Sequence, residues 1–477
     1  MISPERHGAQ AGVAPAATGR CGPPAAENLP RPPTNQRPPG GGPVPARPLP
    51  PPDQPNILLI ICHDLGRHLP CYGVPGLETP NIDRLAAAGA MCTRYFATAP
   101  LCSPSRGCIL TGCYPHTNGL MGLVNRGWDM PDHTPTLAQL LRDAGYVSYL
   151  FGLHHEKKDP RRMGYDHVPP ARGPNHAETV LPSVAEFLHG AREATRGSPF
   201  LAVAGLSEVH RPFKQERYTA ADPAAVAVPA YLPDHPGVRE DLADLAGLVH
   251  AVDDALGTVL DALTDTGLDR RTLVLLTTDH GIAFPRAKST LYDAGIGTAL
   301  LARWPGVIPS GAAVDALLSN VDLLPTLLAA AGREIPAHVQ GRSFWPLLLG
   351  EAGTGDEAVF AEKTYHDAYD PKRAVRTDRW KYIRNFEPGP ELVLPADIAA
   401  SPSAAAVADV AERPRADEEL YDLQADAWER HNLAQDLKHG ATVGEMRGRL
   451  LRWMEETGDP LLTGPVPDAG AGVGVAP

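Results

Sequence analysis

The sequence predicts an α/β fold: a large, mostly parallel, doubly wound sheet flanked by helices, followed by a smaller C-terminal α+β subdomain with an antiparallel sheet. Short apolar runs rich in β-branched residues alternate with segments of helical periodicity between residues 55 and 280. Several of these runs end in polar residues, and open α/β sheets bind ligands at the carboxyl ends of their strands. After about residue 350, strand-like segments follow one another directly, which is typical of an antiparallel sheet.

Length, composition and charge set the class of protein. The chain has 477 residues, enough for one large domain and a smaller one. Its hydrophobic content of 43% and charged content of 21% are typical of globular proteins. The net charge of −13 argues against nucleic acid or an anionic membrane as a partner, and no apolar run is long enough to span a membrane. An anionic small substrate is compatible, because it needs only a locally basic pocket.

The cysteines indicate a reducing compartment. An odd number of them, crowded into the first quarter of the chain, does not resemble a disulfide framework, and no pair has zinc-like spacing. No segment typical of a secretion signal is recognisable, so we expect a cytoplasmic location. The seven residues are Cys21, Cys62, Cys71, Cys92, Cys102, Cys108 and Cys113.

Composition also predicts the domain boundaries. Residues 1–53 are rich in Pro and Gly and predict a disordered tail. We expect the catalytic domain over 54–349, the C-terminal subdomain over 350–462 and a flexible tail over 463–477. Within the subdomain, the Ala/Pro-rich residues 388–416 predict a surface insertion.

Four strands are predicted in the first domain, each followed by polar side chains. The continuous apolar run at residues 57–61 is typical of a strand buried on both faces. Further strands are predicted at 146–151, 199–206 and 271–276. The polar residues that follow these strands are His63 and Asp64, His154 and His155, His210, and Asp279 and His280.

Helices are predicted between and after these strands. Thr79-Pro80 and Thr134-Pro135 are helix-start signals, and residues 238–264 place leucines near one helical face. In the C-terminal part, strands are predicted at 373–379 and 380–385 and a helix near 443–456.

The segment Cys102-Ser103-Pro104-Ser105-Arg106 is the strongest candidate for chemistry. Ser103 is a good N-cap and Pro104 suits the first helical position, so we expect Cys102 just before a helix N-terminus, where an anion is favoured. A partly buried cysteine at a turn would also explain the motif by itself. The polar strand ends, which could converge on Cys102, favour a functional site.

At this point the chain resembles the formylglycine-dependent (type I) sulfatases of the alkaline phosphatase superfamily, from about residue 54 to 462. The segment at residues 284–292 resembles the branch that includes heparan N-sulfatase. The resemblance rests on motifs in the family's order: Asn56 with Asp64-Leu65-Gly66, Cys102-Ser103-Pro104-Ser105-Arg106 with Thr111-Gly112, Gly152 with His155, His210, Thr278-Asp279-His280-Gly281, Lys288, Arg303-Trp304-Pro305-Gly306 and Glu419-Leu420-Tyr421-Asp422-Leu423.

The resemblance implies that a formylglycine-generating enzyme oxidises Cys102 to formylglycine (3-oxoalanine). The hydrated aldehyde, a gem-diol, would be the nucleophile: one hydroxyl attacks sulfur, and the other later loses its proton so that sulfate is expelled. A thiolate would instead leave a thiosulfate that water cannot easily cleave.

The resemblance also implies a divalent cation bound by Asp64, Asp279, His280 and the group at position 102. His63 stands where the family usually has a carboxylate, and whether it is a ligand stays open. Calcium is the family's usual ion and our first choice. Manganese is the alternative, because it accepts imidazole readily.

Four further residues receive roles from the resemblance. Arg106 would orient the nucleophile and His155 would be the base that triggers sulfate elimination. His210 and Lys288 would bind sulfate oxygens and protonate the leaving oxygen. Leu153 replaces the family's usual lysine, and Lys157, Lys158 or His154 could substitute for it.

The expected function is therefore hydrolysis of small sulfate monoesters, such as sugar or aryl sulfates. Hydrolysis of sulfamates (N-sulfo groups), or of phosphonate monoesters and phosphodiesters, is the alternative chemistry. A non-catalytic binding protein with the sulfatase fold is a third possibility. Each candidate residue taken singly is more often structural, but the ordered set favours catalysis.

Overall fold

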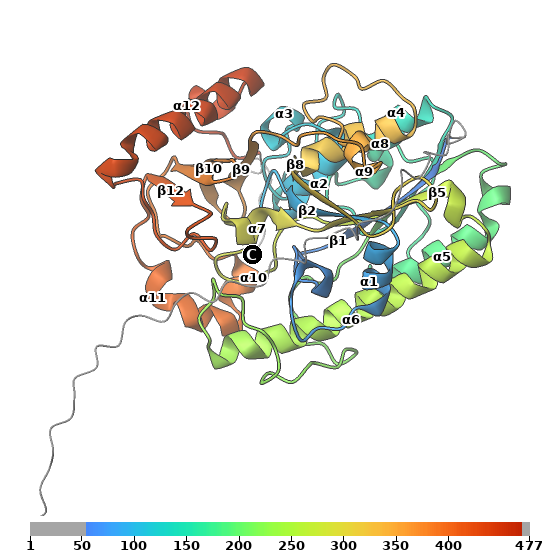
Figure 1. The fold of residues 1–477 in the computed structure, drawn as a ribbon, viewed down its shortest axis with the longest axis horizontal. Coiled ribbons are helices and arrows are strands. Elements are labelled where there is room, and N and C mark those ends of the chain that lie inside the picture. Colours follow the sequence, from blue (N-terminus) through green and yellow to red (C-terminus); the bar gives the residue numbers. More distant parts are fainter. Residues whose placement is uncertain (1–53, 470–477) are drawn as a thin grey trace, which may run out of the picture. The chain divides into compact units, whose positions relative to one another are not determined.

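The main sheet of the protein has eight strands. The structure is a computed structural model that describes residues 54–469, so the predicted tail over residues 1–53 lies outside the described residues. The strand order is β3-β4-β1-β5-β7-β2-β6, with β8 also paired to β2 (Figure 1). The strands are β1 (Asn56–Cys62), β2 (Ala90–Phe96), β3 (Val147–Gly152), β4 (Phe200–Gly205), β5 (Thr272–Thr278), β6 (Gly297–Thr298), β7 (Leu300–Arg303) and β8 (Ala312–Ser319).

The four predicted strands form one parallel block of this sheet, and β2 and β8 form a second parallel pair. β1 lies between β4 and β5, and β3 pairs with β4, all in parallel register. β7 runs antiparallel to β5 and β2, and β6 runs antiparallel to β2, because the chain turns back after β5 without a long crossover helix. The only α-helix in that connection is α7 (Asp293–Ile296). The sheet is therefore mixed, with its parallel strands at the predicted positions.

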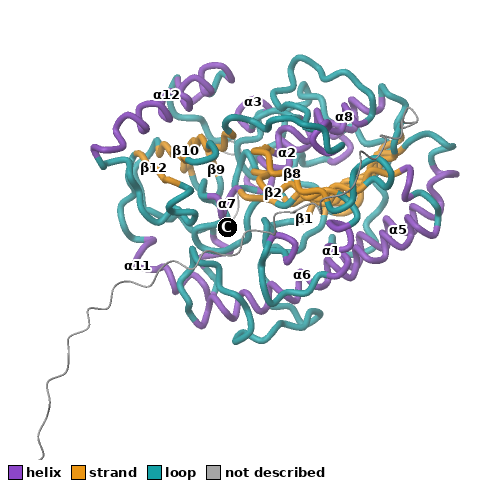
Figure 2. Tube along the Cα trace, viewed as in Figure 1, coloured by secondary structure: helices purple, strands orange, loops and turns teal. Residues whose placement is uncertain are grey.

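Helices cover both faces of the sheet, as Figures 1 and 2 show. Side chains of β1 alternate between the two faces, as a strand requires: Leu58 and Ile60 pack in one core, and Ile57 and Leu59 in the other. The first core is covered by α1 (Pro80–Ala87), α5 (Ala177–Ala194) and α6 (Pro236–Asp265). The second is covered by α2 (Cys102–Thr111), α4 (Leu137–Arg142), α8 (Leu323–Ala330) and α9 (Trp345–Leu348).

The C-terminal part contains the expected antiparallel sheet. Its four strands have the order β12-β11-β10-β9, and α12 (Gly440–Thr457) packs Met446, Leu450 and Trp453 against its apolar face. The strands are β9 (Val359–Tyr365), β10 (Tyr369–Arg376), β11 (Trp380–Asn385) and β12 (Glu418–Asp422). Among the described residues, no helix has the length and apolar character of a membrane span.

Several local predictions need correction. The helix expected at Thr134 begins later, because Thr136 forms a capping box with Gln139. Residues 388–416 are more than a surface insertion: they contain α10 (Ala396–Ala399) and α11 (Ala408–Ala411), and Ile398 is fully buried. In the segment predicted as a flexible tail, Val466 is buried and its carbonyl accepts a hydrogen bond from Tyr365. Residues 470–477 lie outside the described residues.

Candidate active site

Cys102 is the first residue of α2, and the helix begins two residues earlier than predicted. Leu101 is the N-cap, and its carbonyl accepts a hydrogen bond from Ser105 N (3.0 Å). Ser103 is therefore inside the first turn, where its hydroxyl accepts a hydrogen bond from Val124 N (3.2 Å) and fixes the following loop. Pro104 also lies in this turn, where its missing N–H has no helical acceptor to lose.

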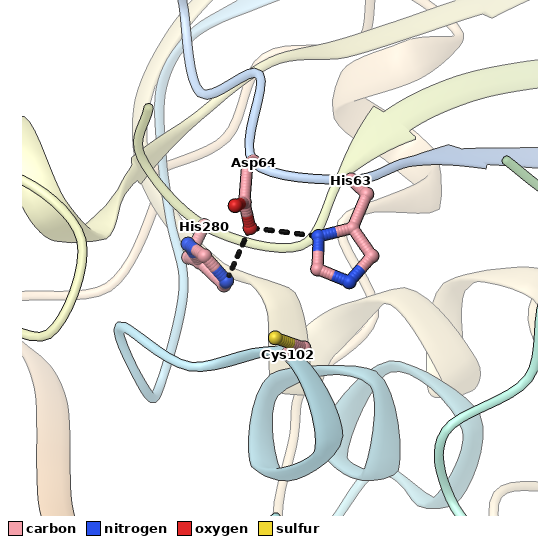
Figure 3. Close-up of side chains that lie close together, drawn as sticks. All are labelled: His63, Asp64, Cys102 and His280. Carbon is pink, nitrogen blue, oxygen red and sulfur yellow. Dashed lines mark hydrogen bonds and ion pairs between the residues drawn. The ribbon is translucent and has the colours of Figure 1, made fainter. Parts of the chain in front are cut away.

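Adjacent strands bring the polar strand ends together. β1 and β5 are paired in parallel up to Cys62 and Thr278, so His63 and Asp64 leave the sheet beside Asp279 and His280. The ligand atoms of His63, Asp64, Cys102 and His280 all lie within 4.8 Å of one another (Figure 3). Asp64 Oδ1 lies 2.7 Å from His63 Nδ1 and 3.1 Å from His280 Nε2. Four of the five predicted metal-binding residues thus form one buried cluster.

Asp279 borders this cluster. Its Oδ1 accepts hydrogen bonds from Asp64 N (3.0 Å) and His280 N (2.9 Å). Its Oδ2 has no hydrogen-bond donor among the described residues, and it lies 3.6 Å from His63 Nδ1 and 3.7 Å from Arg106 Nε. Asp64 adopts a φ of 53°, a conformation uncommon outside glycine and typical of functional sites.

The donor set suits a divalent cation. His280 Nδ1 donates to Gly281 O (3.0 Å) and His63 Nδ1 donates to Asp64, so the Nε2 atom of each ring is the one free to act as a ligand. Both Nε2 atoms and Asp279 Oδ2 are buried and without a hydrogen-bond partner among the described residues. Buried polar atoms in proteins are nearly always satisfied, so this arrangement fits a site for an ion.

Charges in the cluster are strongly coupled. Burial by itself would raise the pKa of Asp64, but Lys288 and His63 hold it well below its usual range. Burial would lower the pKa of His63, but Asp279 and Asp64 raise it to about 10. A divalent cation would compete with the protons that these carboxylates hold on the imidazoles.

Cys102 lies in the positive field of the same cluster. Burial alone would raise the pKa of its thiol, but the positive charges of His63 and Lys288, with smaller effects of His155 and His280, lower that pKa well below the usual value. An anionic group at position 102 is therefore stabilised by at least two cationic side chains.

A cavity of about 220 Å³ opens onto Cys102. Three of the predicted catalytic residues, His155, His210 and Lys288, line it with Cys102. Arg106 does not line it: its guanidinium is fully buried, donates to Ile61 O (3.4 Å) and lies behind Asp279. The remaining lining residues are Leu123, Asn125, Arg126, His366, Asp367, Ala396 and Asp397.

Each of the three predicted catalytic residues that line the cavity is held in place by backbone geometry or by a polar partner. Gly152 at the end of β3 has a φ of 73°, and a Cβ there would lie 2.4 Å from Gly205 O, so glycine lets the chain pass β4 on its way to His155. His210 Nδ1 donates to Arg211 O (2.6 Å), which leaves its Nε2 as the free ring nitrogen. Lys288 Nζ lies 2.7 Å from Asp64 Oδ2 and 2.9 Å from Asp397 Oδ2.

The lysines near Leu153 do not take the place of the lysine side chain that the family usually has at position 153. Lys157 Nζ is bound to Asp132 (2.7 Å) and to Pro131 O (3.2 Å), and Lys158 is exposed. Neither lines the cavity, and nor does His154. The arginine that does line it is Arg126, the last residue of the 3-10 helix Val124–Arg126, which the sequence did not single out.

The acidic side chains of the cavity wall were also missed. Asp367 belongs to the turn between β9 and β10, and Asp397 to α10, inside the Ala/Pro-rich segment. Both lie more than 75 residues after the last catalytic motif residue, Lys288, in segments without any recognisable pattern. No local signal in the sequence could have identified them.

Comparison with known proteins identifies the family. Residues 55–333 match the family model "Sulfatase", and residues 281–403 match "N-sulphoglucosamine sulphohydrolase, C-terminal". Arylsulfatase A of Homo sapiens is 31% identical over 80% of this chain and 83% of its own length. N-sulphoglucosamine sulphohydrolase of Homo sapiens is 28% identical over 86% and 92%.

A solved structure has the same fold. It is described as a complex with its substrate D-glucosamine-2-N,6-O-disulfate, and it aligns with a TM-score of 0.67 and 19% identity over 85% of this chain and 99% of its own. With the family model matching more than half of this chain and the site motifs assembled around one cavity, the chain belongs to the sulfatase family, the enzymes that hydrolyse sulfuric esters.

Proposed function

We propose that this protein hydrolyses sulfate monoesters with a formylglycine made from Cys102 as its nucleophile. The observation that supports this best is the convergence of His155, His210 and Lys288 on Cys102 in one cavity. The hydrated aldehyde supplies one hydroxyl for attack on sulfur and a second whose deprotonation releases sulfate. Conversion of Cys102 requires a formylglycine-generating enzyme as a maturation partner, which is part of the proposal.

A divalent cation belongs to the proposed site. His63, Asp64, Asp279 and His280 would hold it beside residue 102, and when bound it would neutralise sulfate charge as a Lewis acid. The donor set contains two imidazole nitrogens, which favour manganese over calcium. Calcium prefers oxygen ligands, so we propose Mn²⁺ over Ca²⁺.

The side chains of the chain divide the remaining work. Lys288 faces the cavity as an ammonium and can bind sulfate oxygens. His210, once its Nε2 is protonated, can bind a further sulfate oxygen and donate that proton to the leaving oxygen. His155 lines the cavity with Cys102 and helps to lower the pKa of its thiol, which suits a base that removes a proton from residue 102. Arg106 does not line the cavity, and its guanidinium, 3.7 Å from Asp279 Oδ2, stabilises the negative charge of that carboxylate.

Sulfamate hydrolysis is the second candidate function. The match of residues 281–403 to the C-terminal model of N-sulphoglucosamine sulphohydrolase favours it, because that stretch includes Lys288 and the Asp397 of the cavity wall. Both reactions use the same nucleophile and sulfate-binding groups and differ only in the leaving atom. The cytoplasmic location stays a prediction.

Two measurements test the proposal. The protein is co-expressed with a formylglycine-generating enzyme, and mass spectrometry of the peptide with residue 102 should show the loss of mass from thiol to aldehyde. Initial rates are then compared on an aryl sulfate, an N-sulfo sugar and an aryl phosphonate monoester, with Cys102→Ala as the control. Unmodified cysteine, or turnover that persists in Cys102→Ala, would refute the nucleophile. A preference for the phosphonate would replace the proposed substrate class, and no turnover of any ester by the modified enzyme would indicate a binding protein.

A further inference from the structure

Asp397 brings a carboxylate from a distant part of the chain into the wall of the cavity. Its helix α10 is fixed by buried contacts on either side: Ile398 is fully buried, and Ser403 N donates to Asp241 Oδ2 of α6 (3.1 Å). On the other side, Ala396 N donates to Asp367 Oδ2 (2.9 Å). Asp397 is therefore held at a defined place although it belongs to an Ala/Pro-rich connection.

Only one oxygen of Asp397 is used within the protein. Oδ2 accepts a hydrogen bond from Lys288 Nζ (2.9 Å) and lies 3.8 Å from His210 Nε2. Across residues 54–469, no donor is bound to Oδ1. The side chain lines the cavity and is 21% exposed. Asp397 thus offers a charged acceptor to a molecule whose sulfate is bound by Lys288.

Asp367, the other acidic residue of the wall, is fully occupied. Its Oδ1 accepts from Arg126 (2.7 Å), and its Oδ2 accepts from Ala396 N and lies 3.2 Å from His366 Nδ1. The hydrogen bond from His366, against a smaller effect of burial, holds the pKa of Asp367 below its usual range. Asp367 therefore positions Arg126 and α10, while Asp397 is left to contact the substrate.

The cavity places Asp397 beside the group that binds the sulfate. Its volume is about 220 Å³, and Lys288 and Asp397 both line it. A group that hydrogen-bonds to Asp397 while the sulfate contacts Lys288 must lie close to the sulfated position of the substrate, because both contacts share one carboxylate. A hydroxyl or ammonium group can donate there, whereas a second carboxylate would face a like charge.

Resting on the proposed sulfatase function, we propose that Asp397 is a specificity-determining residue that selects a sulfated sugar with a hydroxyl or ammonium group beside the sulfated position. It accepts a hydrogen bond from that group through Oδ1. A uronic acid sulfated at O4, whose carboxylate is attached to the neighbouring carbon, is disfavoured.

The test compares substrates within each variant. Values of kcat/KM are measured for 4-nitrophenyl sulfate, for a panel of monosulfated hexoses and hexosamines, and for a 4-O-sulfated uronic acid. Changing Asp397 also disturbs Lys288, but every substrate has a sulfate, so the ratio of the best sugar to the aryl ester isolates the sugar contact. In Asp397→Ala this ratio should fall by about tenfold to a hundredfold, the effect of one hydrogen bond to a charged group.

Asp397→Asn keeps an acceptor oxygen and loses the charge. It should therefore recover part of the ratio for a hydroxyl-bearing sugar, and discrimination against the uronic acid should weaken in both variants. Asp409→Asn is the matched control, because Asp409 lies in the same segment but is exposed and paired with Arg413 (3.0 Å) on the surface. Its ratios should equal those of the wild type.

A binding measurement separates this inference from the function it rests on. Affinity for glucosamine 6-sulfate is measured by calorimetry with Cys102→Ala and with Cys102→Ala/Asp397→Ala, and the double variant should bind at least tenfold more weakly. If no ester is hydrolysed but this difference is found, the proposed function fails and the role of Asp397 stands. If esters are hydrolysed but Asp397→Ala changes neither the sugar-to-aryl ratio of kcat/KM nor the affinity for glucosamine 6-sulfate, the role of Asp397 is refuted. It is also refuted if the protein binds and cleaves only the aryl ester.

Discussion

Substitution of Arg373 in β10 tests whether a buried ion-pair network supports the cavity wall. Its guanidinium is fully buried between two carboxylates: Nε and Nη2 lie 2.5 and 3.0 Å from Asp459, and Nε lies 3.1 Å from Glu362 Oε2. Nη1 also donates to Lys363 O and Lys372 O, each at 3.0 Å. These bonds tie β9 and β10 to the C-terminal segment, and the turn between the two strands contains Asp367 of the cavity.

Arg373→Met should be strongly destabilising, because it leaves the carboxylates of Glu362 and Asp459 buried with less compensation. Breaking a buried ion pair in this way costs about 3–5 kcal/mol. With an unfolding entropy of about 2 cal/mol/K per residue over the described part of the chain, the melting temperature should fall by about 3–6 °C. Differential scanning calorimetry at one scan rate measures this, with the exposed Arg413→Met as the control that should lose under about 0.5 kcal/mol.

A compensating variant tests the mechanism of that loss. If the loss comes from buried carboxylates left without a cation, Arg373→Met/Glu362→Gln/Asp459→Asn should melt at a higher temperature than Arg373→Met alone, although three polar groups have been altered. A melting temperature of Arg373→Met within 1 °C of the wild type would refute the reasoning. So would a triple variant that is less stable than the single one.

Three further predictions concern the active site and pH. Lys288→Met should lower kcat/KM for a sulfate ester by about 10²–10³-fold, whereas Lys288→Arg, which keeps the charge, should retain more activity; equal losses would contradict a role for the charge. Removing the metal with a chelator should lower the melting temperature by about 3 °C if the ion was present at a hundred times its Kd. Mn²⁺ should restore the melting temperature at a lower concentration than Ca²⁺ does, and the reverse order would contradict imidazole ligation. Burial raises the pKa of Glu429 to about 7 although Lys381 lies 3.0 Å away, so the folded state holds this proton more tightly than the unfolded state. That stabilisation is lost as pH rises from about 4.5 to about 7, by up to about 3 kcal/mol, relative to Glu429→Gln; parallel pH profiles of thermal unfolding for the two proteins would refute it.

Much of the catalytic centre could be predicted from the sequence, because it depends on short-range patterns. A continuous apolar run predicts a buried strand wherever it occurs, and β1 and β5 lie where such runs predict them. Parallel strands end at the same edge of a sheet, so the polar residues that follow β1 and β5 could be expected to lie near one another. The chemistry assigned to Cys102 came from the resemblance to the sulfatases, since no local pattern distinguishes a formylglycine precursor from a buried thiol.

The rest of the site depends on contacts between distant segments. Lys288 and Asp397 are 109 positions apart, and their hydrogen bond exists only because α10 packs near the mouth of the cavity. Ser103, a good N-cap by its residue type, instead binds the loop at Val124, and Lys157 is drawn to Asp132 and away from the cavity. The propensity of a residue for a helix, strand or cap depends on its neighbours in the sequence. The positions of these side chains depend instead on residues that are distant in the sequence and contact them in the folded protein. The sequence by itself therefore indicated the family, the candidate nucleophile Cys102 and the candidate metal-binding residues, whereas only the tertiary structure decided which charged side chains line the cavity.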